Sequence, residues 1–280
     1  MRIPEETRVV IIGAGSAGLS ALRAVQKETD DYLMVGPGPL GTKCARAGCM
    51  PSKTLIRAAR DYHRRGALSE QGISGGDGLV CDVPVVLRYV RRMRDQFAGH
   101  MAAAVRRLAG ERLVPGPVRI QAPRWVEIDG HLVSAGAIVV ATGSRPLVPE
   151  AWQPFQDHVL TGESLFEQED LPGRIAVVGM GPIGLEIGQA LSRLGIQVTG
   201  FDLLEMVGGL TDPDVNAKAV EVFGREFALH LGARAEVQAG AEGSGLTVRA
   251  GEARVGTDAH PGPRRERAYP GRGDGGAGGG

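Results

Sequence analysis

Apolar residues along this chain fall into two patterns: short continuous runs, and longer stretches in which they recur every three or four positions. The continuous runs are rich in Val and Ile, which is typical of strands buried in a parallel sheet. The stretches with helical spacing predict amphipathic helices. Strands are expected at 8–12, 32–35, 112–114, 118–120, 125–128, 131–133, 136–141, 174–178, 197–201, 229–231 and 246–248. Helices are expected at 19–27, 53–65, 84–108 and 185–194, with a further helix beginning at Asp212-Pro213. The alternation of strands and helices predicts an α/β fold.

Two glycine-rich turns follow apolar strands and precede helices. The first is Gly13-Ala14-Gly15-Ser16-Ala17-Gly18, and the second is Gly179-Met180-Gly181-Pro182-Ile183-Gly184. In a G-x-G-x-x-G turn the first glycine permits a tight bend, the second lets a pyrophosphate approach the backbone, and the third lets the helix pack against the strand. A single match is a weak signal, but two copies in the same strand–turn–helix context predict two dinucleotide-binding units.

An acidic residue distinguishes the two units. Asp202 closes the strand that follows the second turn, where a carboxylate accepts hydrogen bonds from ribose hydroxyls and repels a 2′-phosphate. No Arg neighbours Asp202 in the sequence, so we expect NAD rather than NADP in the second unit. The corresponding position of the first unit is Gly36, with no carboxylate nearby.

Composition places few further constraints on function. The 280 residues are 42% hydrophobic and 23% charged, and Lys+Arg equals Asp+Glu, so charge gives no reason to expect nucleic acid or an anionic membrane as partner. No apolar run is long enough for a membrane helix, and the first residues lack the apolar core of a secretory signal. We therefore expect a cytoplasmic protein.

Two of the three cysteines lie five residues apart in Gly41-Thr42-Lys43-Cys44-Ala45-Arg46-Ala47-Gly48-Cys49-Met50-Pro51-Ser52-Lys53. The spacing matches neither a disulfide framework nor a pair of zinc knuckles, which leaves a redox pair. Cysteines at i and i+5 of a regular helix are too far apart for a disulfide, so the backbone between Cys44 and Cys49 is expected to be irregular, with Gly48 and Pro51 fitting that distortion. Cys81 has no partner in the sequence and is expected to be a small buried or loop residue.

The order of these motifs resembles the flavin-dependent pyridine nucleotide–disulfide oxidoreductases, and within them most of all the dihydrolipoyl dehydrogenases. Besides the two turns and the cysteine block, the segment 139–146, Val-Val-Ala-Thr-Gly-Ser-Arg-Pro, contributes to this resemblance over residues 7–250. It implies an α/β fold of two Rossmann-like three-layer domains, with the FAD domain incomplete and a disordered C-terminal tail. The implied domains are an FAD-binding domain with the redox disulfide at 1–148, an NAD-binding domain at 149–250 and the tail at 251–280.

The resemblance also implies roles for individual residues. Cys49 would face the flavin and Cys44 would exchange with the thiol substrate, while Lys53 would lie near the flavin, oriented by Glu186. The remaining implied contacts are to the cofactors. FAD would be held by Gly13, Gly15, Ser16, Gly18, Gly41, Thr42, Lys53, Val118, Thr142 and Gly143, and NAD by Gly179, Gly181, Gly184 and Asp202.

The implied reaction converts dihydrolipoamide and NAD⁺ to lipoamide and NADH, with a free or lipoyl-domain thiol as substrate. The sequence departs from the family after about residue 250, where 10 of the last 30 residues are Gly and 5 are Arg. The rest of the FAD domain, the dimerisation domain of the family homodimer and its His-Glu base are not recognised, which suggests a truncated or frame-shifted reading. The alternatives are a catalytically silent nucleotide-binding fragment and a related mercuric or glutathione reductase-type enzyme.

Overall fold

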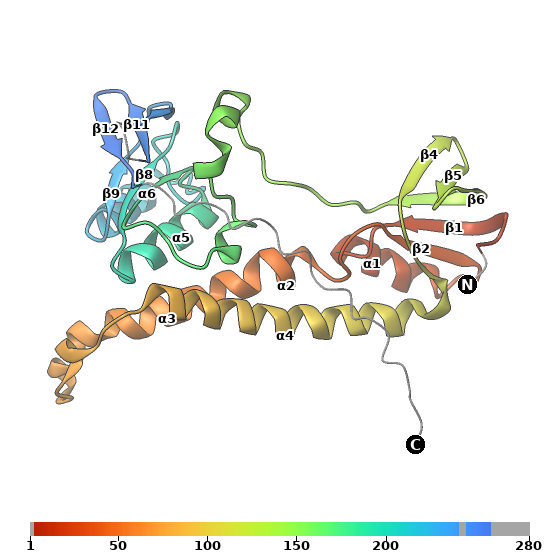
Figure 1. Ribbon diagram of the computed structural model, residues 1–280, viewed down its shortest axis with the longest axis horizontal. Helices are drawn as coiled ribbons and strands as arrows, with labels where there is room; N and C mark the ends of the chain where they lie inside the picture. The colour runs from red at the N-terminus through yellow and green to blue at the C-terminus, as the bar shows by residue number, and fades with distance from the viewer. Residues whose placement is uncertain (1–2, 241–244, 259–280) are drawn as a thin grey trace, which may run out of the picture.

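The computed structural model describes residues 3–240 and 245–258 and arranges them as two α/β units (Figure 1). A long helical hairpin and an extended segment around residues 141–149 both run between the units. The predicted α/β class is confirmed, because parallel strands and helices alternate in both units. Within the described residues no helix combines the length and the apolar character needed to cross a membrane.

The first unit is built on a sheet whose strand order is β3-β2-β1-β6-β5-β4. β1, β2, β3 and the second half of β6 run parallel, whereas β4, β5 and the start of β6 form an antiparallel meander. The strands are β1 (Glu6–Ile12), β2 (Tyr32–Gly36), β3 (Leu113–Pro115), β4 (Val118–Ala122), β5 (Trp125–Ile128) and β6 (His131–Val140). The two strands expected at 131–133 and 136–141 are therefore one strand that changes partner along its length.

Both faces of β1 are buried, as its apolar sequence predicts. Val10 and Ile11 are fully inaccessible. Ile11 packs with α1 (Ser16–Val25) and the end of α4 (Val83–Ala109), whereas Val10 packs with the meander. This burial fixes the loop that follows β1 against the rest of the unit.

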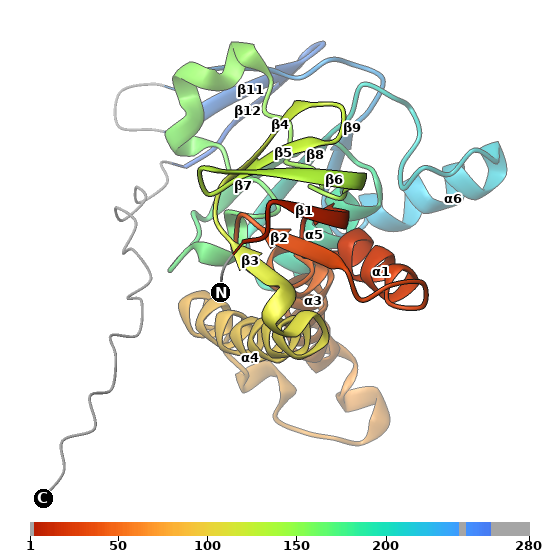
Figure 2. The ribbon, with the colours of Figure 1, turned by 90° about the vertical axis from the view of Figure 1, so that its right-hand side faces the viewer.

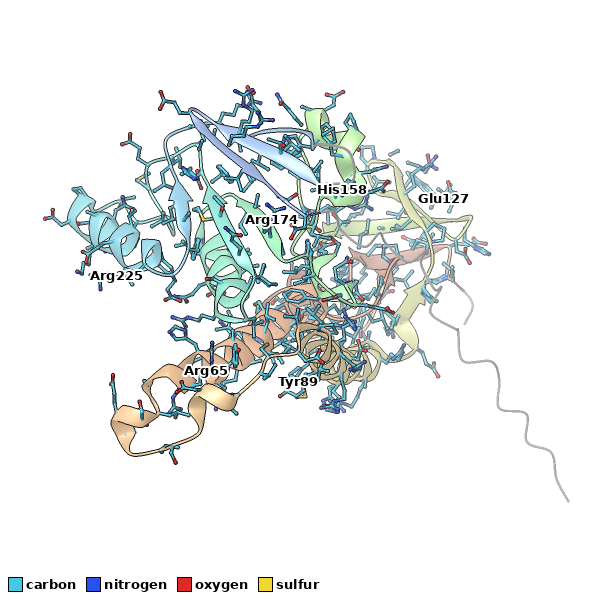
Figure 3. All side chains as sticks on the ribbon, turned by 60° about the vertical axis from the view of Figure 1, so that its left-hand side comes forward. Arg65, Tyr89, Glu127, His158, Arg174 and Arg225 are labelled. Carbon is cyan, nitrogen blue, oxygen red and sulfur yellow. The ribbon has the colours of Figure 1, made fainter. Side chains whose placement is uncertain are left out.

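The helical hairpin consists of α3 (Cys49–His63) and α4, which lie side by side in Figures 1 and 2. Leu55 of α3 and Leu87 of α4 are buried in the same apolar cluster as Leu191 of the second unit. Short α2 (Lys43–Ala47) precedes α3, and Figure 3 shows Arg65 just beyond the end of α3, where its guanidinium lies 3.7 Å from the Tyr62 ring centre. The hairpin therefore anchors the cysteine block to both units.

The second unit has three layers. A parallel sheet of order β7-β8-β9 lies between α5 and an antiparallel sheet of order β10-β11-β12. Its elements are β7 (Arg174–Val178), α5 (Pro182–Arg193), β8 (Gln197–Phe201), α6 (Pro213–Gly224), β9 (Ala228–His230), β10 (Glu236–Ala239), β11 (Leu246–Ala250) and β12 (Ala253–Gly256). The predicted start of α6 is confirmed, because the Asp212 carboxylate accepts from the N–H groups of Asp214 and Val215, each at 3.0 Å.

Two points differ from expectation here. The strand expected at 174–178 is confirmed as β7, but the burial typical of such an apolar run is incomplete: β7 is only half-buried and Val178 is 41% exposed, because one edge of the strand pairs with no strand in the described part of the chain. The disordered tail was expected from residue 251, but residues 253–256 form β12. Val255 of β12 pairs with Val248 of β11 and packs against the second unit. Residues 259–280 of the expected tail lie outside the described residues.

Candidate redox and dinucleotide-binding site

The two glycine turns share one geometry. Gly13 and Gly179 open the turns with φ of +117° and +99°, a backbone conformation that favours glycine. A Cβ on Gly18 would lie 1.9 Å from the Gly13 carbonyl oxygen, and a Cβ on Gly184 would lie 1.8 Å from that of Gly179. The third glycine of each turn is therefore required for the close approach of helix to turn.

The middle glycines have open space instead. A Cβ on Gly15 or Gly181 would meet no atom within 4 Å. Both residues cap helices, α1 beginning at Ser16 and α5 at Pro182, and neither helix has a side-chain cap. The first N–H groups of these helices are thus available to an anion, which is the arrangement that binds a pyrophosphate.

Asp202 follows β8 beside the second turn. Its carboxylate accepts from the N–H of Met180 at 2.5 Å and from the N–H of Leu204 at 2.9 Å, which holds the turn against the strand end. The residue lines a cavity of about 590 Å³ with Gly179 and Arg234. No Arg neighbours Asp202 in the sequence, but Arg234, which is distant in sequence, lines the same cavity.

Gly41 and Thr42 position the helix that carries the first cysteine. Gly41 has φ of +98°, and a Cβ there would lie 3.1 Å from the Cβ of Met101 in α4. The Thr42 hydroxyl accepts from the N–H of Ala45 at 3.2 Å and so caps α2. The chain is thus held close to α4 at Gly41, two residues before α2 begins, which limits the positions available to Cys44.

Cys44 and Cys49 lie on either side of a helix break. Gly48, between α2 and α3, has φ of −131° and ψ of −116°, so the irregular backbone expected from the spacing is present. The two residues are in hydrogen-bonding contact as free thiols, which raises the pKa of the Cys44 thiol above its ordinary value, with burial as the next cause. The Cys49 main-chain N–H acts in the opposite direction, as does the charge of Lys53. Cys44 is partly exposed and Cys49 exposed, so both sulfurs are accessible to a reactant.

Lys53 and Glu186 lie on helices that pack against each other, α3 and α5. Both side chains are exposed, and no ion pair joins them among the described residues. The charge of Lys53 nevertheless acts on Cys44. The structure thus brings Lys53 to the cysteines but leaves the Lys53–Glu186 pair unformed.

Lys43, next to Cys44, has contacts that the sequence did not predict. Its Nζ donates to the carbonyl oxygen of Ser144 at 2.9 Å and forms an ion pair with Glu163. Ser144 follows β6, and Glu163 lies shortly before β7. The partners are more than 100 residues away in sequence, and the only available signal was a cation inside the cysteine block.

Three further residues of the expected FAD site lie at the edge of the first sheet. Thr142 and Gly143 follow β6 and are exposed, with Gly143 at φ of +75°. Ala141, which precedes them, donates its N–H to the Ile12 carbonyl oxygen at 2.8 Å, so this segment meets the end of β1 just before the first glycine turn. Val118 begins β4 and packs with the meander side of the sheet.

Comparison with known proteins agrees with this geometry. The sequence profile of the pyridine nucleotide-disulphide oxidoreductases matches residues 7–258, which include both turns and both cysteines. The chain belongs to this family. Members of the family use FAD and NAD(P), and the uncapped helix starts beside Gly15 and Gly181 fit the pyrophosphates of two such cofactors.

Curated relatives include several kinds of enzyme. The chain is 32% identical over 197 residues to dihydrolipoyl dehydrogenase of Thermus scotoductus, which covers 68% of this chain and 41% of that protein. It is 28% identical over 216 residues to dihydrolipoyl dehydrogenase of Vibrio cholerae, with 75% and 45% covered. It is 30% identical over 212 residues to mercuric reductase of Bacillus cereus, with 74% and 33% covered. The chain thus matches less than half the length of these relatives.

Solved structures show the same fold. LpdA from Mycobacterium tuberculosis matches 91% of this chain and 57% of its own, with a TM-score of 0.74 and 23% identity. The HOCl-induced flavoprotein disulfide reductase RclA from Escherichia coli matches 90% of this chain and 55% of its own, with a TM-score of 0.70 and 18% identity. At these identities the likeness concerns the fold alone.

Proposed function

We propose that this chain carries the redox pair and both dinucleotide-binding units of an NAD-linked disulfide oxidoreductase that acts on a dihydrolipoyl group. The contact between Cys44 and Cys49 across the helix break at Gly48 supports this most directly. The two sulfurs are close and accessible, as a reducible pair requires. The matched dihydrolipoyl dehydrogenases favour a dithiol substrate.

The cysteine pair would react by thiol–disulfide exchange. With Cys44 and Cys49 oxidised, one substrate thiolate attacks the Cys44 sulfur, forming a mixed disulfide and releasing the Cys49 thiolate. The second thiol of the substrate then attacks the substrate sulfur that is bonded to Cys44. The substrate leaves as a cyclic disulfide, and Cys44 is released as a thiolate. The substrate has then lost two electrons and two protons, and the cysteines have gained the two electrons. FAD and NAD⁺, when bound, supply the route by which these electrons leave the pair.

Other residues of this chain would position the pair. Lys53 would stabilise thiolate character through its charge, as it already does for Cys44. Glu186 would orient Lys53 after a change of side-chain rotamer, since the two residues sit on packed helices without an ion pair. Gly13, Gly15, Ser16, Gly18, Gly41, Thr42, Val118, Thr142 and Gly143 would hold FAD, and Gly179, Gly181, Gly184 and Asp202 would hold NAD. We expect the enzyme to act as a cytoplasmic homodimer.

The full chain, reconstituted with FAD, tests this proposal. We expect a flavin absorbance spectrum and, after addition of NADH, two additional alkylatable thiols relative to the oxidised protein, both of which are lost in a Cys44→Ser, Cys49→Ser variant. Dihydrolipoamide, glutathione disulfide and Hg²⁺ in parallel assays separate the dihydrolipoyl, glutathione and mercuric alternatives. Equal alkylation of both cysteines before and after NADH would contradict the redox role.

A catalytically silent NAD-binding fragment is the second candidate. One observation favours it: the second unit has an acid, Asp202, at its strand end, whereas the first has Gly36 there. This second candidate predicts a protein that binds NADH but is colourless, because it holds no FAD. Binding of FAD with retention of the yellow colour through gel filtration would exclude it.

A further inference from the structure

Trp152 belongs to the segment that joins the two units, yet it lies at the dinucleotide cavity of the second unit. It is part of η5 (Glu150–His158), a 3₁₀ helix that precedes β7. Its N–H donates to the Pro149 carbonyl oxygen at 2.9 Å, which fixes the turn that carries the indole. Trp152 lines the cavity of about 590 Å³ that Asp202 and Arg234 also line. The joining segment therefore contributes to the wall of a site that is otherwise built on the strands of the second unit.

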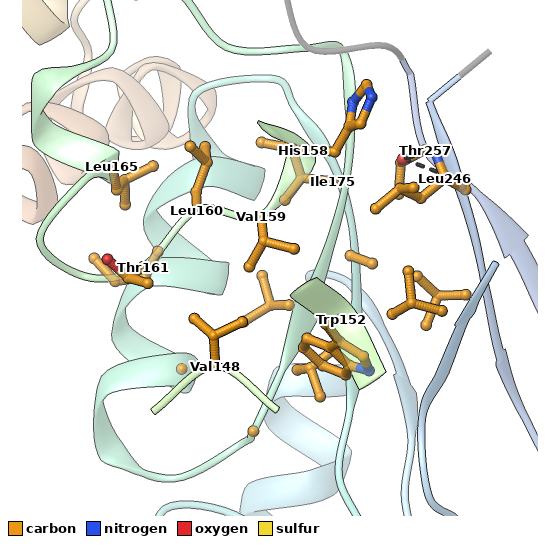
Figure 4. A pocket seen from close by; sticks show the side chains of 18 of the residues that line it. Val148, Trp152, His158, Val159, Leu160, Thr161, Leu165, Ile175, Leu246 and Thr257 are labelled. Carbon is orange, nitrogen blue, oxygen red and sulfur yellow. Dashed lines mark hydrogen bonds between the residues drawn. The ribbon is translucent and has the colours of Figure 1, made fainter. Parts of the chain in front are cut away.

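A second cavity, of about 400 Å³, adjoins the first at this residue. Trp152, Val178 and Val237 line both cavities. Figure 4 shows Trp152 and Val148 among the side chains on the wall of the 400 Å³ cavity. The side chain of Trp152 is half-buried, so part of the indole remains accessible to a ligand beside Asp202.

The order of groups in a dinucleotide decides which part of it reaches Trp152. The pyrophosphate is expected at the uncapped start of α5 beside Gly181, and the ribose next to it at the Asp202 carboxylate. A single bond joins the adenine to that ribose, so the adenine lies in the cavity that Asp202 lines. At about 590 Å³ this cavity falls within the usual range of small-molecule sites.

The walls of this cavity offer the adenine one aromatic face. Trp152 is the only aromatic side chain on its lining in the described part of the chain, and its other apolar residues, such as Val178, Leu203 and Val237, are mostly aliphatic. A nucleic-acid base stacks on an aromatic side chain with a gain of roughly 5- to 150-fold in affinity, whereas an aliphatic side chain offers no π-face. The adenine therefore has one preferred partner among these walls.

We propose that Trp152 is a cofactor-binding residue, whose indole stacks on the adenine of the dinucleotide held at the second glycine turn. Asp202 then binds the ribose and Trp152 the base. This inference rests on the proposed function only in that the second unit binds NAD. It also gives the joining segment a part in binding, because the same segment carries Glu163, the partner of Lys43.

Tryptophan fluorescence of the full chain tests the contact directly. In a Trp125→Phe background Trp152 is the sole tryptophan. Saturating ADP-ribose, which has the adenosine and the pyrophosphate but no nicotinamide, should quench its emission. Gly181→Ala, which occupies the pyrophosphate position of the second turn, should abolish this quenching. The matched variant Gly15→Ala in the first turn should leave it unchanged, because nucleotide bound in the first unit does not reach Trp152.

Substitution of Trp152 separates cofactor binding from packing. Trp152→Ala should weaken the binding of ADP-ribose and of NADH by the same factor, about tenfold, because both ligands carry the adenosine. Trp152→Phe keeps an aromatic face and should weaken binding much less. Calorimetric titration measures these affinities, and thermal unfolding without ligand shows that each variant is folded. A side chain that only packs the joining segment would change the unfolding temperature and leave the affinities as they are.

Three outcomes would overturn the inference while the proposed function stands. One is unchanged emission of Trp152 when ADP-ribose binds. Another is equal affinity of the parent chain and Trp152→Ala for ADP-ribose. The third is a loss for NADH without a loss for ADP-ribose, which would place the indole at the nicotinamide. A parent chain that binds neither ADP-ribose nor NADH would overturn the inference and the proposed function together.

Discussion

Lys43, the residue before Cys44, contacts both Ser144, just after β6, and Glu163, in the segment that leads to β7. Its Nζ bonds to the Ser144 carbonyl oxygen at 2.9 Å and pairs with the Glu163 carboxylate. The side chains of Lys43 and Glu163 are 42% and 41% exposed, so water screens the pair. The contact therefore orients the cysteine block more than it stabilises the fold.

A double-mutant cycle with Lys43→Met and Glu163→Gln should give a coupling energy of about 0.2–1 kcal/mol between the two side chains, from free energies of unfolding measured in urea. The coupling should shrink as salt is raised, because the pair is exposed to counterions. Lys218→Met with Glu221→Gln, an exposed pair on α6, is a matched control that should leave the reactivity of Cys44 unchanged. Unchanged alkylation of Cys44 in Lys43→Met would rule out an orienting role for Lys43.

The glycine turns offer matched substitutions that separate folding from binding. Gly18→Ala and Gly184→Ala place a methyl group within 2 Å of a carbonyl oxygen, so we expect a loss of roughly 1–3 kcal/mol in the free energy of unfolding. Gly15→Ala and Gly181→Ala meet no atom and have negative φ, so stability should change little. These two variants should instead weaken binding of FAD and NAD respectively, because the methyl group occupies the pyrophosphate position.

Thermal unfolding and nucleotide titration of the four variants measure these effects side by side. Destabilisation by Gly15→Ala equal to that by Gly18→Ala would contradict the assigned roles. So would unaltered NADH binding by Gly181→Ala.

Local signals in the sequence account for most of the first unit and for part of the site. The glycine turns, the Asp212 cap and the break at Gly48 were predictable, because each depends on the conformational preference of one or two residues. β6 was predicted as two strands, because its apolar pattern is interrupted at Gly136, whereas the backbone continues from one partner strand to the next.

Contacts between segments that are distant in the chain could not be predicted from the sequence. Arg234 shares a cavity with Asp202, and Lys43 reaches Glu163, only because the fold brings them together. β12 was missed because a four-residue edge strand contains too few apolar positions to show a period, although Val255 pairs with Val248. The apolar sequence of β7 predicted a strand, but the number of strands that pair with β7 depends on distant segments and could not be predicted from it.

The pKa of Cys44 gives a pH-dependent prediction for the reduced protein. Contact with Cys49 raises this pKa, followed by burial, so less Cys44 is thiolate near neutral pH than in an ordinary cysteine. Cys49→Ala removes that contact, so its Cys44 alkylation profile should shift to lower pH. Iodoacetamide rates measured by peptide mass spectrometry in a Cys81→Ser background would show this. An unshifted or upward-shifted profile would mean that the two side chains are not in contact in solution.

Asp202 and Arg234 should together set the choice between NADH and NADPH. The Asp202 carboxylate would accept from ribose hydroxyls and repel a 2′-phosphate, whereas the Arg234 guanidinium in the same cavity would attract one. We expect the parent chain to bind NADH more tightly than NADPH. Asp202→Asn should reduce this difference in affinity, because NADPH binds more tightly once the carboxylate charge is removed. Arg234→Ala should increase the difference. Because Asp202 also accepts from Met180 N–H, Asn can keep that bond through its amide oxygen and preserve the turn. Paired fluorescence titrations with NADH and NADPH on the three proteins decide the matter: tighter binding of NADPH by the parent chain would show that the charge of Arg234 outweighs that of Asp202.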